Sequence, residues 1–304
     1  MLRLSNIAIL LQHDIVSSWQ ITDRQAQRLR DELPGASVNV CRSEDAFLDA
    51  LPEADCAMVW RFRQDWLERA PRLKLLTTPA AGRDYFKIIP PAGLRMMYGR
   101  FHGVLIGETV LGFLLGMCRG ILPAVTQWAG QEWPRRQLDA EMRPLRGSNV
   151  TILGYGNIGR CIRKLLLPLG VNVIGVRHKA EDGCIGLDGL DAVLPITDHL
   201  VIALPGTDAN RHFVDRAMLA KLPRHATVVN IGRGSVLDQD ALADALEQGS
   251  ISAACLDVFE EEPLPMESRL RYCQRLWRTP HASAISPDYL DLYIDDFLTQ
   301  LKDI

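Results

Sequence analysis

Three segments in the second half of the chain carry residues that could bind a carboxylate and transfer a proton. Arg233 stands between two glycines in "NIGRGS", Glu262 precedes a proline in "FEEEPLP", and His281 follows a proline in "RTPHAS". A guanidinium can bind a carboxylate through two parallel hydrogen bonds. A histidine paired with a carboxylate has a raised pKa and can exchange a proton with a hydroxyl or carbonyl oxygen. Each residue alone also has a plain structural interpretation, as a loop histidine or a surface charge.

A glycine-rich turn, "TILGYGNIGR" at residues 151–160, lies near the middle of the chain. An apolar run predicts a strand before it, and a segment compatible with a helix follows at once. Gly154 would permit the tight turn, Gly156 the approach of the backbone to a pyrophosphate, and Gly159 close packing of the helix on the strand. The helix N-terminus would offer N–H groups and a partial positive charge to phosphates. A structural turn is the alternative, but this order of elements favours a bound dinucleotide.

The next apolar run, "VNVIGV", ends in the basic residues Arg177, His178 and Lys179. NAD-binding units usually place an Asp or Glu at this point, about 20 residues after the glycines, to accept hydrogen bonds from the ribose 2′-OH. A cationic cluster suits a 2′-phosphate instead. The sequence therefore predicts NADP as the preferred cofactor, with NAD possible. A solvated basic loop is the alternative interpretation.

The elements that must position these residues alternate along the chain. Short apolar runs, predicted as strands, alternate with helix-compatible segments from residue 7 to about 90 and again from residue 149 onward. The predicted helices include Asp23–Glu32 in the first series and Asn157–Leu169 in the second. This pattern predicts an α/β protein with two doubly wound parallel sheets. Between them, residues 104–122 form an apolar helix that Glu108 and Arg119 interrupt, which argues against a membrane span. That helix lies either at a subunit interface or inside one subunit.

Composition narrows the class of protein. The 304 residues have a net charge of −3, which argues against a nucleic-acid partner. Seven scattered cysteines without a CxxC pair fit reduced thiols in the cytoplasm, and no zinc or other metal site is expected. The apolar run at residues 7–11 is too short for a signal sequence. We therefore expect a cytoplasmic enzyme that acts on a small molecule.

Residues 103–286 resemble the D-isomer-specific 2-hydroxyacid dehydrogenase family. "RPLRGSNVTILGYGNIGR" resembles its cofactor signature, and the segments around Arg233, Glu262 and His281 resemble its three catalytic blocks in their usual order. The first half is similar more weakly, through "ADCAMVW" and "PRLKLLTTPAAGRDYF". "LDVFEEEPLP" and "TPHASAIS" are most similar to the glyoxylate/hydroxypyruvate reductase subgroup.

The resemblance implies a domain organisation. Residues 1–100 with 281–304 would form a substrate-binding domain and residues 101–280 a dinucleotide-binding domain, both Rossmann-like, with the active site in a cleft between them. A homodimer is also implied, which favours an interface for residues 104–122.

The resemblance further implies a mechanism. A 2-keto acid would place its carboxylate on the Ala81–Gly82 turn and on Arg233. His281, kept protonated by Glu262, would give a proton to the keto oxygen as the nicotinamide gives hydride to carbon. The substrate-binding residues would be Ala81, Gly82 and Arg233. Arg61, which follows a predicted strand, is a further substrate-binding candidate on the grounds of its position alone. The cofactor-binding set would be Gly154, Tyr155, Gly156, Asn157, Ile158, Gly159, Arg177, His178, Lys179, Leu204, Pro205, Ile231, Gly232, Arg233, Asp257 and His281.

The sequence departs from the family pattern at a few positions. Arg83 stands where a small apolar residue commonly follows the glycine of the substrate loop, and Gly206 and Asn210 replace a common Leu and Thr. Arg61 and Arg83 both follow predicted strands, on the side where doubly wound domains bind ligands. We expect at least one of them to meet a polar or anionic group on the substrate; exposure to solvent is the alternative. Open alternatives for function are another substrate, such as phosphoglycerate, formate or phosphite, and a nucleotide-sensing corepressor or scaffold.

Overall fold

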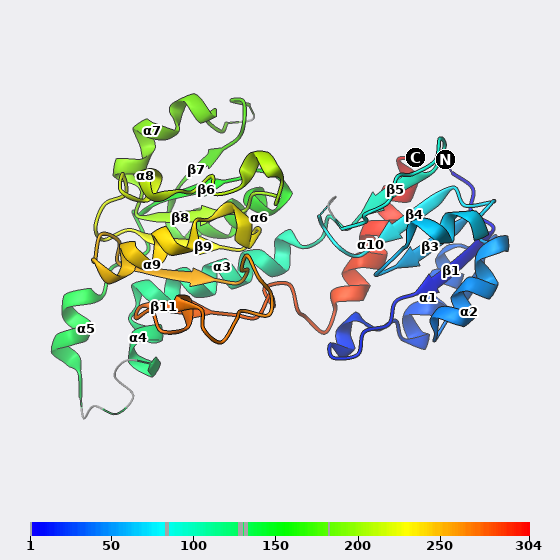
Figure 1. Ribbon diagram of the computed structural model, residues 1–304, viewed down its shortest axis with the longest axis horizontal. Coiled ribbons are helices and arrows are strands. Elements are labelled where there is room, and N and C mark those ends of the chain that lie inside the picture. The colour runs from blue at the N-terminus through cyan, green and yellow to red at the C-terminus, as the bar shows by residue number, and fades with distance from the viewer. Residues whose placement is uncertain (1, 83–84, 127–129, 131–132, 182) are drawn as a thin grey trace. The chain divides into compact units, whose positions relative to one another are not determined.

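The computed structural model describes residues 2–82, 85–126, 130, 133–181 and 183–304. The chain divides into two compact units (Figure 1). Unit 1 comprises Met1–His102 and Ile285–Ile304, and unit 2 comprises Gly103–Ala284. The domain boundary expected after residue 280 falls just before this division, so His281 belongs to the same unit as Glu262 and Arg233.

Unit 1 is an α/β unit with a parallel sheet, as predicted. In the described residues the sheet has the strand order β2-β1-β3-β4-β5, and each neighbouring pair is parallel. Helix α1 begins after Thr22, whose side chain accepts from the Gln25 N–H while the Gln25 side chain accepts from the Thr22 N–H. The strands are β1 (Asn6–Leu10), β2 (Ser37–Val40), β3 (Cys56–Val59), β4 (Leu75–Thr78) and β5 (Arg95–Tyr98); the helices are α1 (Asp23–Glu32), α2 (Glu44–Ala50) and α10 (Tyr289–Lys302).

Helix α10, drawn in red in Figure 1, brings the C-terminal segment back onto the sheet of unit 1. Tyr293 is fully buried, and its hydroxyl is 2.8 Å from the Thr77 hydroxyl on β4. The Gln300 amide donates to the Tyr98 carbonyl oxygen at the end of β5. The last helix is therefore part of the core of the unit that contains the N-terminus.

Unit 2 is a second parallel sheet, with the strand order β11-β10-β9-β8-β6-β7 in the described residues. Alternate strand residues face opposite sides: Val228 packs in one apolar cluster with α7, α8 and α9, and Val229 packs in the other with α3 and α6. The strands are β6 (Asn149–Leu153), β7 (Asn172–Val176), β8 (His199–Ile202), β9 (Thr227–Asn230), β10 (Ala253–Leu256) and β11 (Leu276–Arg278); the helices are α3 (Gly103–Cys118), α4 (Ile121–Thr126), α5 (Arg135–Glu141), α6 (Asn157–Leu166), α7 (Leu190–Val193), α8 (Arg216–Leu219) and α9 (Gln239–Glu247).

Two features of the sheets lie outside what the sequence predicted. The edge strands β5 and β11 are short and were not foreseen. In the described part of the connection after β7, isolated bridges join Val176 to Ile185 and Glu181 to Cys184, where a doubly wound sheet often has a further strand. The predicted fold class, two Rossmann-like α/β units with parallel sheets, is confirmed.

The apolar helix α3 packs closely on α6. A Cβ added at Gly103 would lie 2.5 Å from Cys161 Sγ, and one added at Gly107 would lie 2.7 Å from a methyl carbon of Leu165.

Among the described residues, the structure contains no helix with the length and apolar character to cross a bilayer. In the same residues no cluster of three His, Cys, Asp or Glu side chains could hold a metal ion.

Candidate active site

The predicted site residues of unit 2 follow consecutive strands of its sheet. Because these strands are parallel, their carboxyl ends meet at one edge. The chain leaves β6 toward β7 on one side and reaches β8 on the other, which makes the gap between β6 and β8 the switch point where such sheets bind ligands. The glycine turn follows β6, Arg177 follows β7, Leu204 follows β8, Arg233 follows β9, Asp257 follows β10 and His281 follows β11.

The glycine turn has the geometry expected of a pyrophosphate-binding turn. Gly154 has a φ of 95°, and a Cβ there would lie 2.5 Å from the Ala203 carbonyl oxygen at the end of β8. A Cβ at Gly159 would lie 2.7 Å from the Gly154 carbonyl oxygen, so this glycine lets α6 approach the strand. At Gly156 a Cβ would meet nothing within 4 Å, and the space beside the N-terminus of α6 is open. The turn therefore fits a bound pyrophosphate.

Several members of the predicted cofactor set have buried side chains. Tyr155 is 5% exposed, and its ring occupies the space that a side chain at Gly175 would need. Ile231 is 4% exposed. Contacts of these two residues with a cofactor would come mainly from their main chain, whereas Gly156, Asn157 and Pro205 are exposed and Ile158 and Leu204 are partly exposed.

The basic cluster after β7 contains an acidic partner that sequence reasoning missed. The Arg177 guanidinium forms an ion pair with the Glu181 carboxylate, four residues later. His178 and Lys179 are exposed. An i, i+4 spacing of opposite charges was visible in the sequence, but it is informative only within a helix, and this segment is a turn.

Two glycines fix the loop that carries Arg233. A Cβ at Gly232 would lie 2.5 Å from the Leu204 carbonyl oxygen, and one at Gly234 would lie 1.8 Å from the Phe259 carbonyl carbon. The buried Asn230 side chain accepts from the Gly232 N–H at 3.1 Å and donates to the Arg233 carbonyl oxygen at 3.1 Å. The loop therefore packs closely between the segments that follow β8 and β10.

Gly206, one of the departures from the family pattern, lies against Arg233. A Cβ at this position would be 2.9 Å from Arg233 Cγ and 3.2 Å from its Cβ. The absence of a side chain at residue 206 thus provides the space for the aliphatic part of the arginine. Asn210, the other departure in this segment, donates its amide to the Pro205 carbonyl oxygen at 2.9 Å.

His281 and Glu262 form a hydrogen-bonded pair. His281 Nδ1 is 2.7 Å from Glu262 Oε2, and the other oxygen, Oε1, accepts from the Phe259 N–H at 2.9 Å. The side chains of His281 and Glu262 are 51% and 35% exposed. Glu262 is thus oriented by the main chain, and it orients the imidazole so that Nε2 is the nitrogen left for another partner.

This pair shifts both pKa values in the direction that favours the charged forms. The hydrogen bond to Glu262 raises the pKa of His281; burial and the nearby Arg233 oppose the rise, and the charges of Glu262 and Asp257 add to it. Burial alone would raise the pKa of Glu262, but the bonds from His281 and the Phe259 N–H bring it below its ordinary value. Both shifts thus favour the same charged pair, an imidazolium beside a carboxylate.

Asp257 holds the turn that carries His281. Its residue is fully buried. Oδ1 accepts from the Thr279 hydroxyl at 2.6 Å and the Ala282 N–H at 2.8 Å, and Oδ2 accepts from the Ser283 N–H at 3.1 Å. This positioning role was missed from the sequence, where the residue was expected near the cofactor; that contact stays a prediction.

The predicted substrate-binding residues of unit 1 follow strands of their own sheet. The loop after β4 is held because the Gly99 N–H donates to the Ala80 carbonyl oxygen at 3.0 Å and a Cβ at Gly99 would meet the Pro79 carbonyl oxygen at 2.1 Å. Ala81 is exposed on this loop, and Arg61 is exposed after β3. The binding roles of Ala81, Gly82 and Arg61 stay predictions, and Arg83 lies outside the described residues.

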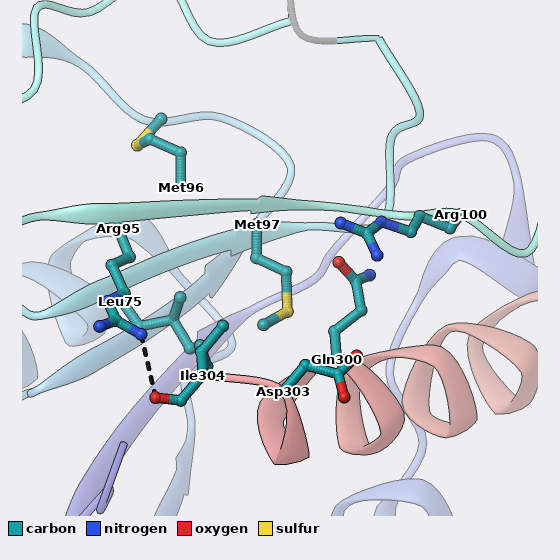
Figure 2. Close-up of a pocket in the computed structure, with 8 residues that line it drawn as sticks. All are labelled: Leu75, Arg95, Met96, Met97, Arg100, Gln300, Asp303 and Ile304. Atoms are coloured by element: carbon teal, nitrogen blue, oxygen red, sulfur yellow. Dashed lines mark hydrogen bonds between the residues drawn. The ribbon is translucent and has the colours of Figure 1, made fainter. Parts of the chain in front are cut away.

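A cavity of about 370 Å³ in unit 1 is lined by none of the described candidates, Ala81, Gly82 and Arg61 (Figure 2). Met97 points into it, Arg100 and Gln300 point toward one another, and the Arg95 guanidinium donates to the Ile304 carbonyl oxygen at 3.1 Å. Ala81 lines a neighbouring hollow together with residues 96–100. Neither this cavity nor the neighbouring hollow is lined by the candidate catalytic residues Arg233, Glu262 and His281.

The fold and the glycine turn define an α/β dinucleotide-binding protein, and comparison with known proteins narrows this class. Residues 111–283 match the family model of the NAD binding domain of D-isomer specific 2-hydroxyacid dehydrogenases. The chain therefore belongs to this family, whose members are oxidoreductases that use NAD or NADP.

Individual relatives have different names. A glyoxylate/hydroxypyruvate reductase B of Pectobacterium atrosepticum is 32% identical over 228 residues, which cover 72% of this chain and 71% of the relative. A D-3-phosphoglycerate dehydrogenase of Methanocaldococcus jannaschii is 27% identical over 271 residues, or 85% of this chain, but this chain spans only 51% of its length. The solved structure of an NADPH-dependent glyoxylate/hydroxypyruvate reductase of Sinorhizobium meliloti with NADP has a TM-score of 0.76 and 25% identity, covering 98% of this chain and 95% of that one.

Proposed function

We propose that the protein is an NADPH-preferring reductase that converts small 2-keto acids, such as glyoxylate and hydroxypyruvate, into D-2-hydroxy acids. The observation that carries this proposal is the 2.7 Å hydrogen bond between His281 Nδ1 and Glu262 Oε2. Arg233 and this histidine follow β9 and β11, the two strands that flank β10. The names of relatives support the substrate class.

The proton that the reaction consumes comes from His281. Nδ1–H donates to Glu262, so the imidazolium offers the proton on Nε2 to the keto oxygen. The imidazole becomes neutral as the oxygen becomes a hydroxyl, and solvent returns the proton to Nε2. Glu262 stays ionised throughout, because its pKa lies below its ordinary value.

Arg233 supplies the positive charge that a 2-keto acid requires. Its guanidinium would bind the substrate carboxylate and polarise the keto oxygen, which becomes more negative in the transition state. Its loop is fixed by Gly232, Gly234 and Asn230, so little reorganisation is needed when the charge develops.

The cofactor would be held by the glycine turn and the basic cluster. The open space at Gly156 and the N-terminus of α6 fit its pyrophosphate, and Arg177, with His178 and Lys179, fits a 2′-phosphate. When bound, the nicotinamide supplies the hydride. The preference for NADPH is part of the proposal.

A turnover screen tests the function. The purified protein is assayed with glyoxylate, hydroxypyruvate and longer 2-keto acids, each with NADPH and with NADH. D-3-Phosphoglycerate, formate and phosphite are assayed in the oxidative direction, each with NADP⁺ and with NAD⁺. We expect the highest kcat/KM with a small 2-keto acid and NADPH. The matched control is His281→Asn, which removes the proposed proton donor and should lower kcat by about 100-fold or more. Turnover of none of these compounds would point to a nucleotide sensor instead.

We also propose that the protein is a homodimer and that α3 contributes to the interface. Val104 is exposed on this helix, and Leu111, Phe113 and Leu115 are only partly buried. In the proposed dimer the accessible parts of these side chains would lie against the second copy, which supports an interface because apolar surface favours association. Light scattering after size exclusion should give twice the chain mass of 34.0 kDa, and Phe113→Glu should shift the protein toward monomer. A wild-type monomer would overturn the proposal.

A further inference from the structure

The turn after β7 places the acidic residue Glu181 beside Arg177, the basic residue proposed to bind the 2′-phosphate of the cofactor. The Arg177 N–H donates to the Ile185 carbonyl oxygen at 3.0 Å, and the Ile185 N–H donates to the Gly175 carbonyl oxygen at 2.9 Å. Within the turn, the Cys184 N–H donates to the Glu181 carbonyl oxygen at 2.9 Å. These main-chain bonds return the chain to the end of β7 and fix the position of residue 181 relative to residue 177.

The side chains meet across this turn. Arg177 Nη1 and Glu181 Oε1 form an ion pair, and the two side chains remain 34% and 50% exposed. The carboxylate thus occupies one edge of the guanidinium that a 2′-phosphate would use. It also lies close to the strand end at which NAD-binding units place their acidic residue, although it comes from a position four residues further along the chain.

We propose that Glu181 is a specificity-determining residue that competes with the 2′-phosphate of NADP for Arg177. This inference rests on the proposed function, specifically on the preference for NADPH. Binding of NADPH requires Arg177 to exchange the carboxylate for the phosphate and leaves two anions near each other. Binding of NADH requires no exchange. Glu181 therefore weakens NADPH binding selectively and narrows the difference between the two cofactors.

Binding measurements on Glu181→Gln test the inference without relying on turnover. Dissociation constants are measured by calorimetry for NADPH, NADH, 2′,5′-ADP and 5′-ADP. The Kd of the two ligands with a 2′-phosphate should fall about three- to tenfold, and that of the other two should change by less than about twofold, as expected for removal of one partly exposed ion pair and its repulsion. Because residue 181 is exposed, the variant should keep the wild-type Tm.

Two further variants separate competition from a general charge effect. Asp188→Asn removes one negative charge from the same connection, but the Asp188 carboxylate accepts from the Gly189 N–H instead of pairing with Arg177. This variant should therefore leave the ratio of NADPH affinity to NADH affinity unchanged. In an Arg177→Gln background, Glu181→Gln should no longer tighten NADPH. The competition is overturned if Glu181→Gln alone leaves the ratio of NADPH affinity to NADH affinity unchanged. It is also overturned if Glu181→Gln still tightens NADPH binding in the Arg177→Gln background.

The same measurements distinguish failure of the inference from failure of the cofactor preference. If Arg177→Gln leaves the NADPH/NADH affinity ratio unchanged, then NADPH is not selected at this position, and both statements fail. If Arg177→Gln lowers the ratio and Glu181→Gln does not raise it, the preference holds and only the competing role of Glu181 is wrong.

Discussion

Asp257 is bonded to the turn of His281 through both its main chain and its side chain. Its carbonyl oxygen accepts from the His281 N–H at 2.8 Å, and its carboxylate accepts from the N–H groups of Ala282 and Ser283. His281 has a φ of 50°, a left-handed conformation that costs about 1–2 kcal/mol for a residue other than glycine. The buried carboxylate thus stabilises the strained backbone from which the imidazole projects.

Asp257→Asn should therefore lower both stability and kcat. An amide keeps one accepting oxygen but presents an N–H group to a donor of the turn, which costs about 1–3 kcal/mol. Displacement of His281 should reduce kcat, measured on the acid plateau of the pH profile, more than it raises KM for the keto acid. Denaturant unfolding and steady-state kinetics provide the two measurements.

Asp55→Asn is the matched control for this variant. Asp55 is also buried, and its carboxylate accepts from the N–H groups of Ser5 and Asn6 at the start of β1. We expect a similar loss of stability and an unchanged kcat. Equal losses of kcat in the two variants would show that Asp257 acts only through overall stability.

The rate of keto-acid reduction should fall as pH rises through the pKa of His281. The hydrogen bond to Glu262 is the main cause that raises this pKa. The imidazole of His281 therefore stays protonated at pH values somewhat above its ordinary pKa of 6.5. Glu262→Gln removes the negative partner, and the decline of kcat should move to lower pH. A profile in Glu262→Gln that coincides with the wild type would exclude the assigned role of Glu262.

The same pair should contribute to stability over a defined pH range. The contribution of His281 is complete below its ordinary pKa of 6.5 and is lost as pH rises through the raised value. The contribution of Glu262 is complete above its ordinary pKa of 4.5 and is lost as pH falls through the lowered value. Because the pair is partly exposed, the free energy of unfolding of the wild type should exceed that of Glu262→Gln by at most about 1 kcal/mol. The difference should be largest between pH 4.5 and pH 6.5. Urea unfolding at several pH values measures it; a difference independent of pH contradicts the linkage.

Gly234→Ala should disturb the site through packing alone. The new Cβ would lie 1.8 Å from the Phe259 carbonyl carbon and 2.1 Å from its oxygen, so the Arg233 loop and the segment leading to Glu262 must separate. We expect a loss of about 1–3 kcal/mol in the free energy of unfolding, with a lower kcat. Gly112→Ala on α3, where a Cβ meets nothing within 4 Å, should be neutral or stabilising; a wild-type kcat in Gly234→Ala would contradict the packing argument.

Arg61→Ala tests whether unit 1 recognises the far end of the substrate. Arg61 is exposed at the carboxyl end of β3. If its guanidinium binds a second polar or anionic group, KM should rise for hydroxypyruvate or a longer dicarboxylic acid by a factor equivalent to about 1.5–3 kcal/mol, with little change for glyoxylate. The control is Arg63→Ala, whose guanidinium pairs with Asp65 and lies over the Trp66 ring. Identical responses to both substrates in Arg61→Ala would remove this anchor.

The local elements of the fold follow from local patterns in the sequence. Helix α1 has the predicted bounds, because Thr22 and Gln25 form a capping box at its start. The predicted helix from Asn157 ends three residues early as an α-helix and continues as a 3-10 turn over Leu167–Leu169, where Pro168 lacks an N–H. The edge strands β5 and β11 were missed because short strands paired on one side carry little hydrophobic pattern.

The candidate site divides in a similar way. The sequence by itself determined which residue types are present and in what order along the chain: the three glycines of the turn, Arg177, Arg233, Glu262 and His281. Only the tertiary structure decided that Asp257 holds the turn of His281, that Gly234 packs on Phe259, and that Glu181 pairs with Arg177. Periodicity reports interactions within one element, whereas these contacts depend on strand order and on the path of turns between strands. For Asp257 and Gly234 that dependence is long-range, so no local pattern encodes it. Glu181 is only four residues from Arg177, but their pairing depends on the path of the turn after β7, which the spacing alone does not give.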